Sequence, residues 1–340
     1  TLVEMSNGCI CCTLRDDLLA EVSRLAREGR FDYLLIESSG ISEPLPVATT
    51  FDFRDENGFS LSDITRLDTM VTVVDCANLL KDYASSDFLR DRGDTAGDGD
   101  ERALVDLLVE QIEFADVVVL NKISTASPGD RQAARTIIKA LNPVARIVET
   151  DFGRVDLDEV LDTGLFNLEA AEANPLWFKE LNGFSEHVPE TLEYGIRSFV
   201  YRARQPFNPL LLDRFINSSW PGVIRAKGFF WLATRPSLVG ELSQAGALVR
   251  TQRRGLWWAA VPRQRWPDDA GWRASMAPYI DPVWGDRRQE IVFIGTDPMD
   301  EPELRRRLDA CLVPARSYKP EAWTSLPDPF PDWTPTSAAP

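Results

Sequence analysis

Short apolar runs alternate with amphipathic helices over the first half of this 340-residue chain. The runs are typical of strands that are buried on both faces of a parallel sheet, and they lie at 31–36, 69–74, 116–120 and 145–148. Around and between them, apolar residues recur with the period of a helix at 15–28, 101–114 and 128–141. This alternation predicts a doubly wound α/β domain, in which helices flank a parallel sheet.

The second half has a different pattern. Longer strands with alternating apolar residues are expected at 195–203, 228–234, 257–261 and 289–295. With helices near 210–217 and 301–311, they indicate a smaller α+β domain. The charge also changes, since residues 1–190 hold 37 acidic and 17 basic side chains and residues 191–340 hold 16 and 20. We predict four segments, namely a first domain, a linker, a second domain and a proline-rich tail extended on the surface, at 1–167, 168–193, 194–313 and 314–340.

The charge and the distribution of apolar residues exclude several classes of protein. The formal net charge is −16, and no dense block of basic residues could follow a nucleic-acid backbone. No apolar run approaches the roughly twenty residues that cross a bilayer, and no basic segment precedes a hydrophobic one as in a signal peptide. The sequence predicts a cytoplasmic protein that binds neither nucleic acid nor membranes, and it leaves the oligomeric state open.

Three of the five cysteines stand within four positions, as Cys9, Cys11 and Cys12. Thiolates at this spacing can converge on one soft cation such as Zn²⁺ or Cu(I), and three protein ligands leave a fourth position open. That favours a metal held for transfer or sensing over a closed structural site. The alternative is a reactive or buried cysteine cluster without a metal. Cys76 and Cys311 occur in apolar surroundings and are predicted to be core residues.

Polar residues follow two of the predicted strands. Glu37 and Gly40 come after the first run, and Asn121 and Lys122 come after the third. Open α/β sheets bind ligands at the carboxyl ends of their strands, where a carboxylate can hold Mg²⁺ or its water shell. Each feature alone is also common in caps and turns.

In their order, these residues resemble one family. GCICC at 8–12, ESSG at 37–40, the strand that ends at Asp75 and NK at 121–122 are similar to the CobW family of P-loop GTPases. The nearest branch is the zinc-linked, YciC-type metallochaperones. The second half resembles the CobW C-terminal domain at 194–209, 220–236 and 284–295. The expected fold is therefore a P-loop NTPase-type parallel sheet, followed by a smaller α+β domain.

The resemblance implies roles for single residues. Cys9, Cys11 and Cys12 match the zinc-binding motif of the family. Glu37 and Gly40 match its Walker B-type motif, which contacts Mg²⁺ and the γ-phosphate, so that Glu37 is the candidate catalytic residue. Asn121 and Lys122 match its guanine-recognition motif. The implied activity is slow GTP hydrolysis coupled to delivery of zinc to a client metalloprotein. Alternatives are a non-catalytic metal-binding or client-binding adaptor, and an activator of a metalloenzyme of the nitrile hydratase or cobalamin-pathway type.

Two departures from the family pattern qualify these expectations. Ser124 stands where the guanine-recognition motif has aspartate, and a hydroxyl is a weaker partner for guanine than a carboxylate, which predicts weak selectivity for GTP over ATP. No GxxxxGK[ST] phosphate-binding loop occurs in the 340 residues. In the family this loop precedes the cysteine motif, so we expect it upstream of Thr1, and the first domain to be incomplete without it.

Overall fold

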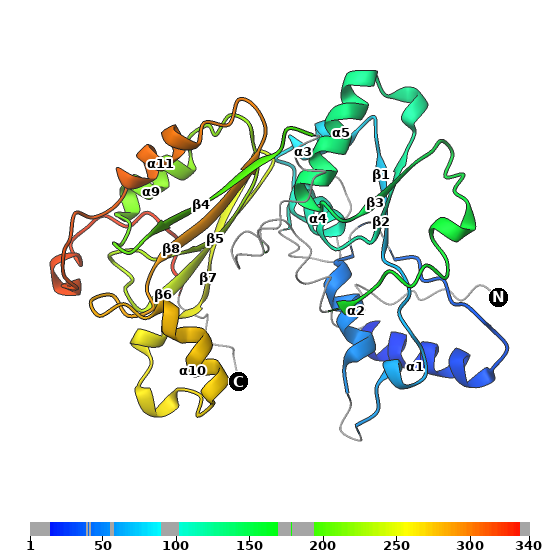
Figure 1. Cartoon of the computed structure of the whole chain (residues 1–340), viewed down its shortest axis with the longest axis horizontal. Helices are drawn as coiled ribbons and strands as arrows, with labels where there is room; N and C mark the ends of the chain where they lie inside the picture. The colour runs from blue at the N-terminus through cyan, green and yellow to red at the C-terminus, as the bar shows by residue number, and fades with distance from the viewer. Residues whose placement is uncertain are drawn as a thin grey trace. The chain divides into compact units, whose positions relative to one another are not determined.

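The computed structural model describes residues 14–38, 40, 42–54, 58–89, 102–168, 178 and 194–333, with side chains from residue 18 onward. The chain divides into two compact units, Thr1–Phe178 and Lys179–Pro340 (Figure 1). The predicted linker lies almost entirely outside the described residues, so the proposed domain bounds stay a prediction. None of the described helices is both long enough and apolar enough to cross a membrane.

The first unit contains the predicted parallel sheet. Its three strands have the order β1-β2-β3 and are β1 (Val71–Asp75), β2 (Val117–Asn121) and β3 (Arg146–Glu149). Residues 117–120 of the central strand are buried, as their unbroken apolar run predicts. The crossovers between the strands run through α3 (Leu79–Tyr83), α4 (Leu104–Glu113) and α5 (Pro128–Leu141). This arrangement confirms the predicted α/β class.

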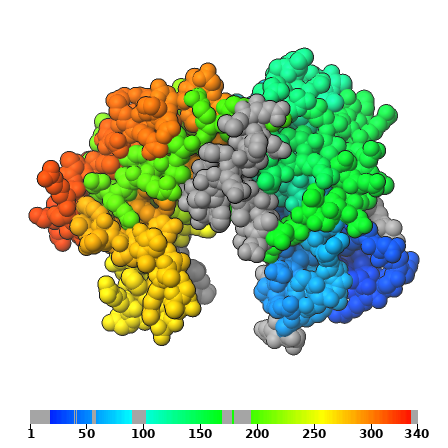
Figure 2. All heavy atoms as spheres, in the orientation of Figure 1, coloured from blue at the N-terminus to red at the C-terminus, as the bar shows by residue number. Residues whose placement is uncertain are grey.

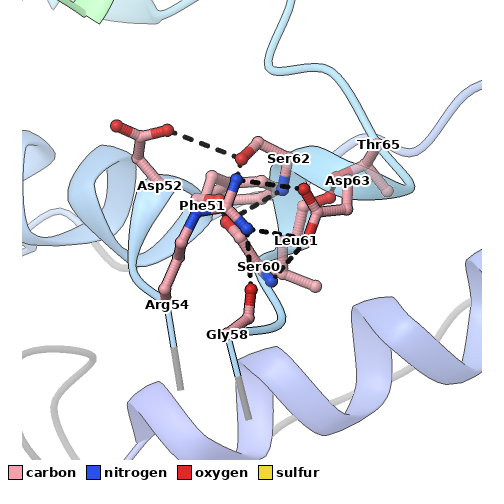
Figure 3. A network of polar contacts seen from close by, with 9 residues as sticks. All are labelled: Phe51, Asp52, Arg54, Gly58, Ser60, Leu61, Ser62, Asp63 and Thr65. Atoms are coloured by element: carbon pink, nitrogen blue, oxygen red, sulfur yellow. Dashed lines mark hydrogen bonds and ion pairs between the residues drawn. The ribbon is translucent and has the colours of Figure 1, made fainter. Parts of the chain in front are cut away.

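A small apolar core joins α1 (Leu14–Glu28), α2 (Pro44–Asp52) and the 3₁₀ turn η1 (Leu61–Asp63), and its buried members are Leu18, Val22, Val47, Phe51 and Leu61. A polar network fixes the turn to the end of α2 (Figure 3). The Ser60 hydroxyl donates to the Phe51 carbonyl at 2.7 Å, and the Asp63 carboxylate accepts from the Ser60 amide at 2.9 Å. The Ser60–Asp63 pair forms a capping box at the start of the turn, and the Ser60 hydroxyl joins that cap to the end of α2.

Residues 31–36 do not form the strand that their apolar run predicts. A strand needs a neighbour for its backbone hydrogen bonds, and no described strand pairs with this segment. Its large apolar side chains are exposed, with Leu35 at 78%, and β1 is an edge strand of the described sheet whose Val73 is 65% exposed. The prediction was wrong because an apolar run specifies burial only where a partner strand is present.

The segment is attached instead through a buried carboxylate, that of Asp68. Asp68 accepts hydrogen bonds from the Tyr33 hydroxyl at 2.7 Å, the Thr69 hydroxyl at 2.8 Å, and the amides of Thr163 at 3.1 Å and Gly164 at 2.7 Å. Burial alone would raise the pKa of Asp68, but these hydrogen bonds outweigh burial and lower the pKa to about 2. Asp68 therefore joins three separate segments as an ionised group.

We expect Asp68→Asn to change how stability depends on pH. A carboxyl group whose pKa is lowered by folding stabilises the fold above its unfolded pKa of about 3.9, and this contribution is lost as the pH falls toward about 2. The variant should lower the free energy of unfolding at neutral pH by about 1–3 kcal/mol and flatten its decline between pH ~4 and ~2. Denaturant titrations across that range measure both effects, with the exposed Asp158→Asn as control. An unchanged acid limb in Asp68→Asn would contradict this assignment.

The second unit is built on one antiparallel sheet with the strand order β4-β8-β5-β6-β7. The strands are β4 (Arg197–Ala203), β5 (Val223–Phe230), β6 (Leu238–Ala245), β7 (Leu248–Leu256) and β8 (Gln289–Gly295). Two helices, α9 (Pro209–Ile216) and α11 (Glu301–Asp309), cover one face of this sheet (Figure 1). Their apolar residues pack on the central strands through a core that includes Phe199, Leu212, Phe215, Phe293, Leu304 and Leu308. The predicted α+β class is confirmed.

The β6–β7 hairpin is absent from the sequence-based assignment, which instead expects a strand at 257–261. In the structure, residues 258–260 form a 3₁₀ turn after β7 has ended. The β7 strand is an edge strand, and charged residues such as Arg250, Arg253 and Arg254 interrupt any apolar alternation along it. The apolar pattern therefore predicts a strand at Trp257 and Trp258, which follow β7. In the structure Trp257 is instead the N-cap of the 3₁₀ turn and Trp258 is its first residue.

The long connection from β7 to β8 contains α10 (Ala270–Met276) and forms a small lobe, drawn in yellow to gold at one end of the second unit (Figure 2). Three tryptophans, Trp258, Trp266 and Trp272, pack edge to face within it, with ring centroids 4.8–6.2 Å apart. The three rings are only partly buried, so these edge-to-face contacts join the ends of the lobe without forming a buried core.

Residues 314–333 do not form the extended surface tail that their proline content predicts. Phe330 and Trp333 are buried in the core of the second unit. Arg235 binds Asp328 through two contacts, from Nε at 2.8 Å and from the second guanidinium nitrogen at 2.9 Å. The aromatic side chains between the prolines therefore make the described part of this segment integral to the unit.

Candidate functional site

The carboxyl ends of β1 and β2 meet at one edge of the parallel sheet. Asp75 and Asn121 are register partners at the last positions of the two strands, so Asn121 and Lys122 lie where the sequence predicts them. Lys122 Nζ lies 2.8 Å from Asp75 Oδ2. Lys122 adopts a left-handed backbone conformation with φ of 60°. Non-glycine residues seldom adopt this conformation, and they concentrate at binding sites.

The amide of Asn121 has a fixed orientation. Its Oδ1 accepts hydrogen bonds from the backbone amides of Lys122 at 2.9 Å and Gly153 at 3.1 Å. Two donors facing the same atom identify it as the oxygen, so the Nδ2 amino group is the part of the side chain left to donate elsewhere. Within the described part of the chain, Nδ2 has no hydrogen-bond partner. Asn121 therefore offers a positioned donor at the sheet edge.

Asp75 is the acidic member of the edge. Partial burial raises its pKa, but hydrogen bonds from Lys122, from the Asn78 side chain at 2.8 Å and from the Ala77 amide at 2.9 Å outweigh burial, so that the pKa lies below its usual range. Asp75 is therefore ionised at neutral pH and holds the Lys122 ammonium group by charge. The sequence analysis places Asp75 at the end of a strand but assigns it no role.

A second loop, which follows β3, packs against the loop that begins at Asn121. Ser124 donates to Asp151 Oδ1 twice, from its amide at 3.0 Å and from its hydroxyl at 2.9 Å. The Ile123 amide also donates to the Thr150 carbonyl at 3.3 Å. The sequence analysis missed Asp151, although the reasoning that selects Asn121 would find it, because it too stands just beyond an apolar run.

Glu37 and Gly40 are not brought to this cluster by any contact. Both residues are exposed, and Glu37 makes no hydrogen bond or ion pair with another described residue. The Gly40 carbonyl accepts a hydrogen bond from the Gln111 side chain of α4 at 2.9 Å. Their predicted roles toward Mg²⁺ and the γ-phosphate stay predictions.

Cys9, Cys11 and Cys12 lie outside the described residues. Among the residues that are described, no group of three or more His, Cys, Asp or Glu side chains could hold a metal ion. Cys76 and Cys311 are free and buried, which confirms them as core residues. Burial raises the pKa of both thiols, that of Cys311 to about 11. As protonated thiols they are poor metal ligands, which leaves the three N-terminal cysteines as the clustered thiol donors of the sequence.

Comparison with known families agrees with the fold of both units. Residues 1–149 match the CobW/HypB/UreG nucleotide-binding domain, and residues 196–312 match the C-terminal domain of the cobalamin synthesis protein CobW. The first match contains the strands of the parallel sheet, and the second contains the strands of the antiparallel sheet.

Similar proteins are known from several organisms. A zinc-regulated GTPase metalloprotein activator 1 of Dictyostelium discoideum is 47% identical over 316 residues, which are 92% of this chain and 66% of that protein. A zinc chaperone of Mycobacterium tuberculosis is 28% identical over an alignment of 346 positions, which covers 97% of this chain and 79% of that protein. The chain thus spans just under two thirds of the length of the Dictyostelium relative.

Among solved structures, the Zn(II)-bound YjiA GTPase from E. coli matches with a TM-score of 0.34 and 18% identity, covering 89% of this chain and 78% of that one. The two domain matches and the Dictyostelium relative are the evidence for the family. The chain therefore belongs to the CobW family, with the nucleotide-binding domain of that family in its first unit and the CobW C-terminal domain in its second.

Proposed function

We propose that this chain is a GTP-binding, zinc-binding metallochaperone that couples slow GTP hydrolysis to delivery of zinc to a client protein in the cytoplasm. The observation that carries the proposal is the edge of the parallel sheet, where Asn121, Lys122 and Asp75 hold one another in fixed positions. The printed names of the relatives, a zinc-regulated GTPase metalloprotein activator and a zinc chaperone, support the same function.

Different residues would bind the base, the γ-phosphate and the Mg²⁺ ion of the nucleotide. Asn121 and Lys122 would bind the base of the nucleotide, and the ion pair with Asp75 keeps Lys122 in place before the nucleotide arrives. Glu37 and Gly40 would lie toward the γ-phosphate and Mg²⁺, with Glu37 as the catalytic carboxylate. Mg²⁺, when bound, neutralises charge on the phosphates during hydrolysis.

Zinc in this proposal is the cargo. The donor set of Cys9, Cys11 and Cys12 consists of soft thiolates, which suit Zn²⁺, and three ligands leave one position through which the metal can pass to a client. The client is a metalloprotein that accepts zinc by supplying further ligands. A chain that binds metal and client without hydrolysing GTP is the second candidate function.

Nucleotide binding tests the proposal. We expect the protein expressed from its complete reading frame to bind GDP, and Lys122→Ala to weaken that binding at least tenfold, about 1.4 kcal/mol. The reason is that Lys122 contributes to the base site and neutralises Asp75, whose carboxylate the variant leaves without its ion-pair partner. Titration with fluorescent GDP measures the effect.

The exposed Lys81→Ala, on α3, is the matched control, because it removes the same charge from a side chain that makes no hydrogen bond or ion pair with Asp75 or Asn121 in the described structure. Equal affinities of Lys122→Ala and wild type would contradict the base site. If the wild type binds no guanine nucleotide, the adaptor function replaces the GTPase function.

A further inference from the structure

The guanine-recognition motif of this chain lacks its carboxylate in sequence, because Ser124 stands where the family has aspartate. Guanine presents two neighbouring donors on one edge, the ring N1–H and the 2-amino group. A carboxylate matches that edge, since it accepts only and has lone pairs on two oxygens, whereas a hydroxyl offers one rotatable oxygen. From the sequence alone, base selectivity should therefore be weak.

The fold brings a carboxylate to the serine. Asp151 stands 27 positions further along the chain, yet its Oδ1 accepts both the amide and the hydroxyl hydrogen of Ser124, at 3.0 and 2.9 Å. Two donors on one oxygen fix the position of the carboxylate. Asp151 Oδ2 accepts no hydrogen bond from the described residues, and the side chain is only partly buried. One acceptor oxygen is thus held beside the motif position and left available.

Asn121 supplies a hydrogen-bond donor to complement the Asp151 acceptor. Asn121 is oriented so that its amino group is the available part, and its Oδ1 accepts from Gly153 of the loop that carries Asp151, so one pair of connected loops offers a donor and an acceptor. Guanine carries acceptors, O6 and N7, on one edge and donors, N1–H and the 2-amino group, on the next. Adenine has a 6-amino donor and an unprotonated N1, which reverses both positions at the distinguishing atoms. A carboxylate at the Asp151 position therefore matches the N1–H and 2-amino donors of guanine, and adenine has neither of these two donors.

The residue after Asp151 also has features of a binding surface. Phe152 is 86% exposed and adopts a left-handed backbone conformation with φ of 58°, which is costly for a bulky side chain. The following residue, Gly153, donates to Asn121, so the loop that carries Phe152 is tied to the motif. An exposed aromatic ring at this place can cover a planar base by stacking.

We propose that Asp151, held by Ser124, supplies the carboxylate that reads guanine in this chain, so that the aspartate missing from the motif is replaced from the loop after β3. This inference rests on the proposed function, since it needs a guanine nucleotide at the same site. It reverses the expectation of weak selectivity that Ser124 raises on its own.

Asp151→Asn is the decisive variant, measured on the protein from its complete reading frame. Competition against fluorescent GDP gives the Kd values of guanosine, xanthosine and adenosine diphosphates. The three share their phosphates, so the ratios of Kd report the base alone. The wild type should prefer guanosine to adenosine diphosphate by about 100-fold or more. In the variant the Kd of GDP should rise roughly 10- to 100-fold while that of xanthosine diphosphate falls, because the asparagine amide donates to the 2-oxo group.

Two further variants keep the result interpretable. Asp158→Asn removes an exposed carboxylate nearby and should leave every ratio unchanged. Ser124→Ala keeps the Asp151 carboxylate but removes one of its two donors, and should weaken GDP binding a few-fold without any gain for xanthosine diphosphate. This pattern differs from a general loss of folding, which would weaken all nucleotides together.

The outcomes separate this inference from the proposed function. If the wild type binds GDP and Asp151→Asn leaves the guanosine-to-xanthosine ratio unchanged, Asp151 does not read the base, and the proposed function stands. A wild type that binds guanosine and adenosine diphosphates equally would also overturn the inference. If no guanine nucleotide binds to the wild type, both fail.

Discussion

Replacing Cys9, Cys11 and Cys12 together by serine is expected to abolish zinc binding. The wild type should retain about one Zn²⁺ per chain after desalting, and the triple variant none above background. The physical reason is that thiolates are strong ligands for zinc, whereas serine hydroxyls are not ionised at neutral pH and bind it poorly. Elemental analysis of the purified proteins measures the metal content.

The chain offers a matched control in its two other cysteines. Cys76 and Cys311 are buried, and burial raises the pKa of their thiols, so neither is a thiolate at neutral pH. The double variant Cys76→Ala and Cys311→Ala should therefore keep the full zinc content. Full zinc in the triple serine variant, or loss of zinc in the double variant, would contradict the assignment of the metal to the N-terminal cysteines.

Gly228→Ala should destabilise the second unit more than any surface change. Gly228 lies on β5, which pairs with β8 in the interior of the five-stranded sheet. A Cβ atom at this position would lie 2.2 Å from the Glu290 carbonyl oxygen and 2.7 Å from Ile291 Cα, both backbone atoms of β8. The two strands would have to separate, so we expect a loss of about 3 kcal/mol or more in the free energy of unfolding.

Gly255→Ala is the control for that substitution. Gly255 lies on β7 at the edge of the same sheet, and a Cβ atom there would meet no heavy atom within 4 Å. Its effect should stay within about 0.5 kcal/mol. Denaturant unfolding followed by tryptophan fluorescence reports on this unit, because nine of the ten tryptophans lie beyond residue 190. Similar losses in the two variants would show that close strand contact is not what requires glycine at 228.

The fold could be predicted where the apolar pattern of a single segment is enough to specify its structure. Residues 117–120 are uniformly apolar and form the buried centre of the parallel sheet. Residues 31–36 carry the same signal without becoming a strand, since pairing depends on a neighbour rather than on the segment. Conversely, β7 is a strand although it has no apolar run or alternation, because an edge strand tolerates charged residues on its exposed positions.

The candidate site divides in the same way. The position of Asn121 and Lys122 at a strand end could be predicted, because a buried apolar run followed by a polar pair is a local pattern. The pairing of Ser124 with Asp151 could not, because it depends on β2 and β3 being neighbours and on two loops that lie 27 positions apart in sequence. Their juxtaposition is a property of the parallel sheet, which brings the ends of adjacent strands to one edge.

The central claim is that nucleotide state and zinc occupancy are linked, and one measurement tests it most directly. The Kd of zinc is determined by chelator competition on the protein from its complete reading frame, once with a non-hydrolysable GTP analogue and once with GDP. A chaperone that uses hydrolysis to release its cargo should bind zinc with affinities that differ by roughly 5- to 150-fold between the two nucleotides. By the same linkage, zinc should change the ratio of the affinities for the GTP analogue and for GDP by that factor. Identical zinc affinities in the two states would contradict coupling between GTP hydrolysis and metal delivery.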